Sequence, residues 1–591
     1  MKILSIVSVG LFVVITRLTL IEAQSCGPRI RKDWDMMTAI EKTTYRNAIR
    51  ASMDSGAYIK FVEMHTEMRS EMEAHRQCMF VYWHRLLLVV FENMLRGQGA
   101  AYACVTIPYM NWIAASARVT SGACNSFSNC MTIMGELGGS SSGTHRTLSI
   151  NGINSSGRCV NLPPVDRFCQ LHSLTGTACA GCVPRGDWST ARVPSTTGYA
   201  SVRAQIFNGA NIGQMSPSIE QGCHNNVHAN LGSTMDTFAS PSDPIFWSHH
   251  AMVDSLHVIF HKCRVGTTRL TFEQKASHSL AWSSCTRRDS GAFHPTDTIT
   301  MRTGERGRNP IPGSSDPQIG RFFTGVPNQF AGLMDVRDLG ASSYGYAVSG
   351  QVATMFTQCD ASPRSRRLEE TAATNDTSAP TLCEVAGDES YLDEDRNDYA
   401  SQNSFPETDY RGEDDGHEDV VIVDKWGNAI DANTSREDHY ADDAEMQVAD
   451  WYDETLEAMG GDSRDNMDDL ERQACMFENY CLGGTKDYTP EFKAASKTKK
   501  PRCKHIVDAI NNGSLSIQYE SWREAMEARF GCPEPTEAIN STSNTTLWGS
   551  SSGSDSWVSV GTDIQEALTD TVQQLPDLVV VTNLDRIPIK T

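Results

Sequence analysis

The sequence predicts a mainly helical fold for the first 360 residues, and three segments lead to this prediction. Apolar residues recur at helical spacing around His84 in FVEMHTEMRSEMEAHRQCMFVYWHRLLLVVFE, residues 61–92. Two histidines lie four positions apart in GCHNNVH, as on one face of a helix. A third segment, residues 240–263, has two prolines followed by a long apolar run, which is typical of a loop that opens a helix.

In the first segment, Phe80 lies one turn before His84 and Leu88 one turn after it, so the imidazole of His84 is expected on an apolar helix face. His75 precedes His84 by nine residues, which is about two and a half helical turns. A single straight helix would place these two rings on opposite faces, so a break or bend between them is required. His65 is expected on the preceding helix.

The other two segments supply a second set of side chains. His224 and His228 are predicted to share one face of one helix. In residues 240–263, Asp243 lies between the two prolines and is expected to cap the helix that follows. The helix that follows carries three residues at four-residue steps, namely Phe246, His250 and Asp254. One of its faces therefore presents an aromatic ring, an imidazole and a carboxylate.

Six histidines thus form two groups of three. The first group is His65, His75 and His84, and the second is His224, His228 and His250. Each group can offer three neutral imidazoles to one metal ion and leave coordination positions open between the ions, which suits oxygen chemistry. An isolated H-x-x-x-H pair is more often a surface or satisfied pair. Here a W-H-R stretch and a D-P-I-F-W-S-H-H-A-M-V-D run accompany it in order, and this coincidence favours a metal site.

Residues 26–330 resemble tyrosinases, members of the type 3 copper family that also includes catechol oxidases and the oxygen-carrying domains of molluscan haemocyanins. The stretches AHRQCMFVYWHRLLLVVFE, GCHNNVH and SDPIFWSHHAMVD carry the resemblance. It implies a four-helix bundle that holds two copper ions, each bound through the Nε2 atoms of one histidine group. In the adjacent pair, His250 matches the ligand and His249 its non-ligating neighbour.

The resemblance also implies the reaction. Imidazole is a good ligand for both cuprous and cupric copper. With O2 as co-substrate, such a site oxidises o-diphenols to o-quinones and hydroxylates monophenols such as tyrosine at the ortho position. The expected substrates are phenolic small molecules or tyrosyl side chains, and the expected end uses are melanin formation or protein cross-linking.

Four further residues receive roles. Glu220 and Asn225 resemble a pair that in several family members holds a water able to deprotonate a monophenol, so both are predicted to be catalytic. Phe246 is expected to pack under the copper pair, with ordinary core packing as the alternative. Asp254 is expected to accept a hydrogen bond from the second nitrogen of a ligand imidazole, with a solvent-facing or capping role as the alternative.

The chain departs from the family pattern in three places. Many members carry a cysteine cross-linked to the second ligand of the first copper, but Glu73 occupies that position, and Cys78 is expected in a disulfide instead. The family stretch P-Y-W-D-W appears as P-Y-M-N-W in residues 108–112. Residues 113–195 form a long Gly/Ser/Cys-rich insertion that is expected to shape substrate access.

The net charge of -22 argues against partners such as nucleic acid or an anionic membrane, because phosphates would repel the chain. Residues 1–23 read as a secretory signal peptide, with a signal anchor as the alternative, and no later segment reaches the length of a membrane span. The product is therefore expected to be soluble and secreted.

Eighteen cysteines fit the secretory route, where disulfides persist. Thirteen of them lie between Cys26 and Cys359, so at least one of these is free or pairs with the tail. The cysteines of the insertion are predicted to staple it rather than to form a redox or zinc site; they are Cys159, Cys169, Cys179 and Cys182. Glycosylation sequons begin at Asn154, Asn375, Asn433, Asn512, Asn540 and Asn544.

The domain prediction follows from these patterns: residues 24–360 form the copper-binding catalytic domain, 361–470 an acidic disordered linker, 471–535 a small Cys-containing helical module and 536–591 a Ser/Thr/Asn-rich tail. An R-x-R-R pattern matches a proprotein convertase site, with an exposed basic turn as the alternative; its arginines are Arg364, Arg366 and Arg367. We hypothesise that the extension covers the copper site until cleavage after Arg367.

Two other functional classes compete. A haemocyanin-like protein would bind oxygen reversibly with the same six ligands, but it would normally contain repeated copper units, and this sequence has one ligand set and no internal repeat. A non-catalytic matrix protein would leave the retention of all six histidines unexplained. The sequence therefore predicts a secreted binuclear copper phenoloxidase.

Overall fold

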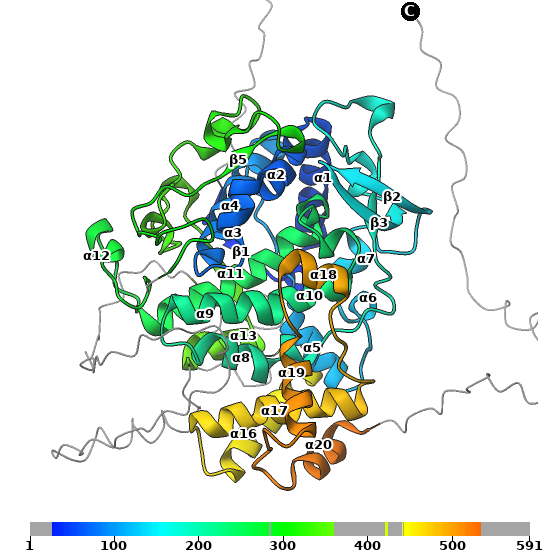
Figure 1. Ribbon diagram of the computed structural model, residues 1–591, viewed down its shortest axis with the longest axis vertical. Coiled ribbons are helices and arrows are strands. Elements are labelled where there is room, and N and C mark those ends of the chain that lie inside the picture. Colours follow the sequence, from blue (N-terminus) through cyan, green and yellow to red (C-terminus); the bar gives the residue numbers. More distant parts are fainter. Residues whose placement is uncertain are drawn as a thin grey trace, which may run out of the picture. The chain divides into compact units, whose positions relative to one another are not determined.

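The computed structural model describes residues 26–282, 285–359, 420–423, 429, 440 and 442–532. The predicted signal peptide, the three arginines of the processing pattern and the Ser/Thr/Asn-rich tail lie outside these residues. Within the described part, no helix is long and apolar enough to cross a membrane. Most of the regular structure is helical, as predicted (Figure 1).

Local residues determine where the amino-terminal helices begin. Helix α1 (Ala39–Asp54) begins with a capping box, in which Thr38 and Glu41 each accept a hydrogen bond from the other's backbone N–H. Helix α2 (Ala57–Thr66) follows Gly56, whose φ of 74° permits the sharp turn between the two helices. The next helices are α3 (Met68–Ala74) and α4 (Phe80–Arg96).

Helix α4 forms the centre of the core. Of its 17 residues, 15 are buried, so it is enclosed on all sides. It packs against α2 and against α11 (Ile245–Arg264). The ring of Phe91 on α4 stacks on that of Trp247 on α11 and meets that of Phe61 on α2 edge-on. These aromatic contacts bring together three helices that carry predicted ligands.

The remaining helices up to residue 359 are α5 (Trp112–Thr120), α6 (Phe127–Cys130), α7 (Thr132–Glu136), α8 (Tyr199–Phe207), α9 (Ile212–Ile219), α10 (Asn225–Leu231), α12 (Phe272–Ala276) and α13 (Gly350–Gln358). A π-helical turn, η6 (Glu220–His224), joins α9 to α10. Such turns are rare and occur frequently at functional sites.

The predicted insertion is partly helical and partly a small sheet. Its strands β2 (His145–Ile150), β3 (Ile153–Val160) and β4 (Val183–Arg185) pair antiparallel. Disulfides Cys159–Cys182 and Cys169–Cys179 staple it. The prediction that these cysteines staple the insertion is confirmed.

A second sheet joins the extension to the catalytic part. Strand β7 (Gly345–Val348) pairs in parallel with β1 (Ile30–Arg31) on one side and with β8 (Val420–Ile422) on the other. Outside this sheet, strands β5 (Arg302–Thr303) and β6 (Ile311–Pro312) pair antiparallel with each other. Because β8 follows the processing pattern in sequence, the extension contributes a strand to the fold of the catalytic part.

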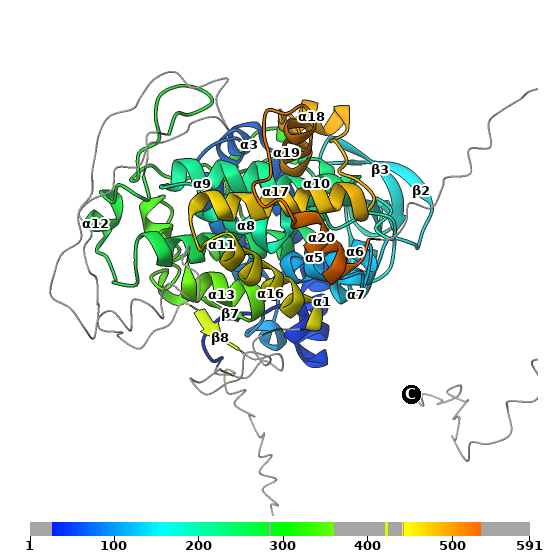
Figure 2. The same ribbon diagram turned by 90° about the horizontal axis from the view of Figure 1, so that it is seen from below.

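The carboxy-terminal module contains α16 (Asp443–Ala458), α17 (Arg464–Cys481), α18 (Pro490–Ser496), α19 (Arg502–Asn511) and α20 (Trp522–Phe530). Disulfides Cys475–Cys503 and Cys481–Cys532 hold it. Helix α17 packs along α8, and α16 along α5 (Figure 2). The described disulfides each lie within the catalytic part or within the module, so none of them joins the two.

The prediction that residues 361–470 are disordered is wrong for residues 443–470, which form α16 and the start of α17. The acidic composition suggested a solvated chain, but the apolar residues of α16 have a surface to pack on. Trp451, Tyr452 and Leu456 are buried, and the ring of Tyr452 meets that of Tyr199 on α8. The helical module therefore begins before residue 471.

Candidate metal centre and active site

The first histidine group is gathered from three elements. His65 lies near the end of α2, His84 lies on α4, and His75 caps the carboxyl end of α3. The required break between His75 and His84 is present: the chain leaves the helix at His75, and Arg76 has a φ of 59°. The ring centroids of this group are 4.8 to 5.7 Å apart, so its three rings converge.

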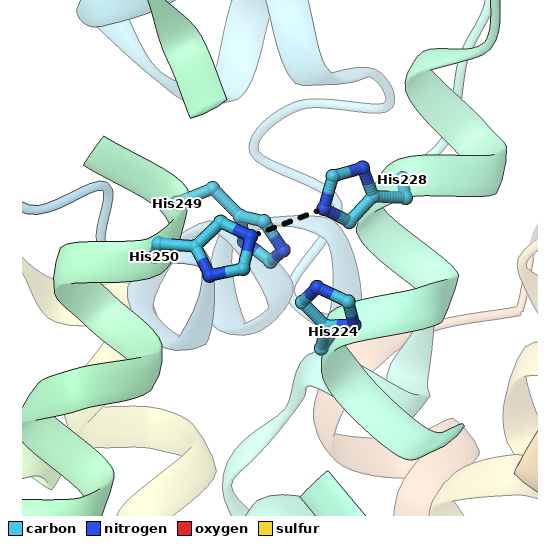
Figure 3. A group of neighbouring side chains, drawn as sticks. All are labelled: His224, His228, His249 and His250. Carbon is cyan, nitrogen blue, oxygen red and sulfur yellow. Dashed lines mark hydrogen bonds between the residues drawn. The ribbon is translucent and has the colours of Figure 1, made fainter. Parts of the chain in front are cut away.

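The second group comes from η6, α10 and α11 (Figure 3). The ring centroids of His224 and His228 are 4.5 Å apart, and both rings face His250. The Nε2 atoms of His228 and His250 are 3.4 Å apart. The prediction that His224 and His228 share a face holds, although His224 lies in the π-helical turn and not in α10 itself.

The two groups adjoin each other. The imidazoles of His84 and His250 stack with their centroids 4.3 Å apart and their planes at 15°. The ring centroids of His84 and His224 are 6.3 Å apart. The structure therefore places a ring of the first group directly against a ring of the second.

Backbone carbonyls orient several of these rings. The Nδ1–H groups of His65, His84 and His228 donate to the carbonyl oxygens of Phe238, Phe80 and Met235. A carbonyl oxygen can only accept, so each of these rings carries its proton on Nδ1 and leaves Nε2 with a free lone pair. The Nε2 atoms of His65 and His84 are buried without a hydrogen-bond partner among the described residues.

Burial keeps the imidazoles neutral. It lowers the pKa of His65 and of His228 to about 4. Burial, followed by repulsion from neighbouring histidines, lowers the pKa of His75, His84 and His250 well below the ordinary value. Neutral imidazoles with bare, converging Nε2 atoms fit copper ions, since copper in either oxidation state accepts this donor set.

His249 lies within reach of the same metal position. A nitrogen of its ring lies within 4.8 Å of the ligand nitrogens of the second group. Its ring stacks on that of His224 with centroids 5.3 Å apart. Figure 3 shows its ring behind that of His250, which faces His228 directly. His250 therefore remains the predicted ligand.

Phe246 lies between the two groups, where it can pack under a metal pair. Its ring centroid is 4.2 Å from that of His250 and 5.2 Å from that of His65. Phe80 also contacts both groups. Its ring centroid lies 4.6 Å from that of His84 and 4.7 Å from that of His224. Both phenylalanine rings are fully buried, so they present apolar surface to the histidines.

Glu220 and Asn225 both line the pocket over the histidines. One carboxylate oxygen of Glu220 accepts the backbone N–H of Arg76 at 2.7 Å, while the other is buried without a described partner. Burial raises the pKa of Glu220 to about 8. The Oδ1 atom of Asn225 lies 3.1 Å from Nδ1 of His224. The structure thus brings the predicted catalytic pair to the pocket, with one carboxylate oxygen available.

The predicted role of Asp254 is wrong. Its carboxylate accepts hydrogen bonds from Arg85, Arg31 and the hydroxyls of Tyr344 and Tyr346, and no ligand imidazole contacts it. Asp254 lies one turn beyond His250, where α11 faces these buried cations rather than the metal site. It therefore connects helices instead of fixing the tautomer of a ligand.

Glu73, at the position of the family's cross-linking cysteine, has its own partners: the backbone N–H of Thr300 and the guanidinium of Arg287. Cys78 pairs with Cys285, as expected for a disulfide. Cys223 is free and buried, which confirms that one cysteine of the catalytic part is left over.

The pocket also contains residues that the sequence did not single out. It has a volume of about 430 Å³, including its opening to solvent. Asp236 and Phe238 line it, and so does helix α18 through Phe492, Ala495 and Ser496. The T-P-E-F stretch at 489–492 signals a helix start, because Thr489 caps the helix and proline follows at its first position. No local signal reveals that this helix lies over the histidines.

Comparisons with known proteins identify relatives of this chain. A protein-family model described as the common central domain of tyrosinase matches residues 55–262, a range that includes all six histidines. A tyrosinase from Streptomyces glaucescens is 31% identical over 237 residues, covering 38% of this chain and 80% of that protein. A tyrosinase from Streptomyces antibioticus is 28% identical over 236 residues, covering 38% of this chain and 81% of that protein. A solved polyphenol oxidase from Thermothelomyces thermophila aligns at 19% identity with a TM-score of 0.33, covering 54% of this chain and 88% of that one. On the sequence matches, the chain belongs to the tyrosinase family of type 3 copper proteins.

Proposed function

We propose that this protein is a binuclear copper phenoloxidase that uses O2 to oxidise o-diphenols to o-quinones and to hydroxylate monophenols at the ortho position. The observation that carries the proposal is the meeting of two three-histidine groups, whose rings His84 and His250 stack 4.3 Å apart beneath an open pocket. His65, His75 and His84 would hold one copper ion, and His224, His228 and His250 the other. When bound, the copper pair supplies O2 activation and accepts electrons from the phenol.

The protein's own residues prepare the site. The carbonyls of Phe238, Phe80 and Met235 fix three imidazoles with Nε2 directed inward. Phe246 is fully buried against His65 and His250 and supplies an apolar floor beneath the histidines. In its ionised form, which a pKa of about 8 makes the major form only above that pH, Glu220 accepts a proton through a water from an incoming monophenol hydroxyl on its unpartnered oxygen. For o-diphenols, two catechols and one O2 give two quinones and two waters.

Oxygen uptake by the copper-loaded protein tests the proposal. Uptake is expected with dopa and with tyrosine, and a copper chelator should abolish both. Reversible O2 binding without turnover of dopa would instead identify an oxygen carrier. Protein that retains no copper and consumes no oxygen would support a matrix role and contradict the proposal.

We further propose that the protein is secreted and that the extension limits access to the copper site until cleavage after Arg367. Eight disulfides among the described residues support secretion, because disulfides persist in oxidising compartments. Helix α18 supports the second point, since Phe492 lines the pocket and is almost fully buried. Melanin formation and protein cross-linking are the proposed uses of the quinone.

A further inference from the structure

Asp236 places a carboxylate at the substrate pocket. It ends the 3-10 turn η7 (Thr234–Asp236), next to Met235, whose carbonyl orients His228. Its side chain is half-buried and lines the pocket together with Phe238. Within the described part of the chain, no lysine, arginine or histidine forms an ion pair with this carboxylate.

Among the described residues, the carboxylate of Asp236 has no cation paired with it. Burial, followed by repulsion from Glu491 on α18, raises the pKa of Asp236 to about 6, so the group is mostly ionised at pH 7. The cation that lines the pocket, Arg76, donates to Glu71 at 2.9 Å. Arg288 contacts Glu71 as well. Both arginines therefore pair with Glu71, and neither forms an ion pair with Asp236, whose charge is left for a ligand.

We propose that Asp236 makes this site select phenols whose side chain ends in an ammonium group over phenols whose side chain ends in a carboxylate. The inference rests on the proposed function and names the substrate class of that same site. An arylethylamine can place its ring near the histidines and its ammonium against Asp236, where partial burial strengthens a charge-assisted hydrogen bond. A carboxylate tail meets repulsion from Asp236 and from Glu491 behind it.

Steady-state oxidation tests the selection. The kcat/KM values for dopamine and for 3,4-dihydroxyphenylacetate are compared in copper-loaded full-length protein, uncut and cut at Arg367. Catechol, which carries no side chain, corrects for differences in folded or copper-loaded enzyme. In Asp236→Asn the ratio of dopamine to dihydroxyphenylacetate should fall by roughly tenfold, the size expected for loss of one partly buried charge pair. An unchanged ratio would overturn the inference.

Two matched variants separate charge from shape. Asp236→Glu retains the charge and should retain most of the preference for the amine. Glu491→Gln removes the neighbouring charge and leaves Asp236 in place, so dopamine should still be preferred. If Glu491→Gln abolishes the preference and Asp236→Asn does not, the selecting charge lies on α18 and the assignment to Asp236 is wrong.

A binding measurement distinguishes failure of this inference from failure of the proposed function. Phenethylamine and phenylacetate have no ring hydroxyl, so their binding to the full-length protein can be measured by calorimetry without turnover. Tighter binding of phenethylamine that is lost in Asp236→Asn supports the inference even if catechol is not oxidised, a result that would defeat the proposed function alone. Oxidation of catechol together with equal binding of the two probes would defeat the inference alone.

Discussion

Arg85 on α4 donates its Nε–H to Asp254 on α11 at 2.7 Å, and this pair links the helices that carry His84 and His250. Both side chains are almost fully buried. Burial alone would raise the pKa of Asp254, but Arg85 and Arg31 outweigh it and hold the pKa below its ordinary value. The distance between the two helices that carry the predicted ligands His84 and His250 thus depends on an ion pair that contacts neither of them.

Replacing Asp254 should therefore weaken both the fold and the metal site. Asp254→Asn leaves Arg85 buried without its counter-charge, and we expect a loss of about 3–5 kcal/mol in the free energy of unfolding. Copper bound per chain should also fall. Thermal melting and elemental analysis measure the two effects. Asp335→Asn breaks a buried pair with Arg337 that includes none of the six predicted ligands, so it should lower stability and leave the copper content unchanged. A wild-type melting temperature in Asp254→Asn would contradict this account.

The adjacent histidines should differ in their effect on metal content. His250→Gln removes a predicted ligand, so copper is expected to fall from two ions per chain toward one. His249→Gln should keep both ions, because the resemblance assigns ligation to His250. Copper removal by a chelator should lower the melting temperature of the wild type, since a bound metal stabilises the native state. Equal copper loss in the two variants would mean that His249 also serves as a ligand.

Glu220→Gln should separate the two phenol reactions. The amide cannot take a proton from a monophenol, whereas an o-diphenol is oxidised without that step in our proposal. Tyrosine hydroxylation should fall by roughly 10²-fold, the lower end for loss of a general base, and dopa oxidation should change much less. Quinone formation from each substrate gives both rates. Equal loss of the two activities would remove the assigned role of Glu220.

Phe492→Ala should raise the activity of the uncut chain. Loss of this ring opens the pocket on the side covered by α18. The rate of dopa oxidation should then approach that of protein cut after Arg367. Phe530→Ala is the control, because Phe530 packs against Trp451 and Phe477 within the module. A double variant, Arg366→Gln with Arg367→Gln, should keep the chain uncut and weakly active; full activity of that uncut product would rule out the covering role.

Glu478 should make stability fall as pH rises toward neutrality. It lies on α17 and accepts the backbone N–H of Ser195 at 3.1 Å, and burial raises its pKa from 4.5 to about 7. The folded protein thus holds a proton that the unfolded chain has already released, so this contribution to stability is lost between about pH 4.5 and 7. Glu478→Gln should flatten the dependence of melting temperature on pH in this window. Glu524→Gln, in the same module, should leave the profile as in the wild type; an unchanged slope in Glu478→Gln would contradict the assignment.

The candidate ligands could be predicted from the sequence because helical spacing is a local property. His224 and His228 are one turn apart on any helix, and the nine-residue step from His75 to His84 demanded the break that occurs at His75. The contact between the rings of Phe246 and His250 follows for the same reason, since Phe246 precedes His250 by one turn on α11. Family resemblance then supplied the identity of the metal.

Other features depended on partners far away in the chain. Asp254 meets Arg85 and Arg31, which are 169 and 223 residues away, and its spacing from His250 alone suggested a partner on the wrong side of α11. The acidic composition of residues 443–470 did not reveal that their apolar side chains pack on α5 and α8. Nothing local places Phe492 or Asp236 at the same pocket.

By itself, the sequence determined which residues can form helices, which histidines share a face, and that two groups of three imidazoles are available. The tertiary structure alone decided that the groups adjoin, that α18 lies over them, and that buried arginines claim Asp254. The physical reason is that helix periodicity acts over a few residues, whereas packing and ion pairing select partners by proximity in space.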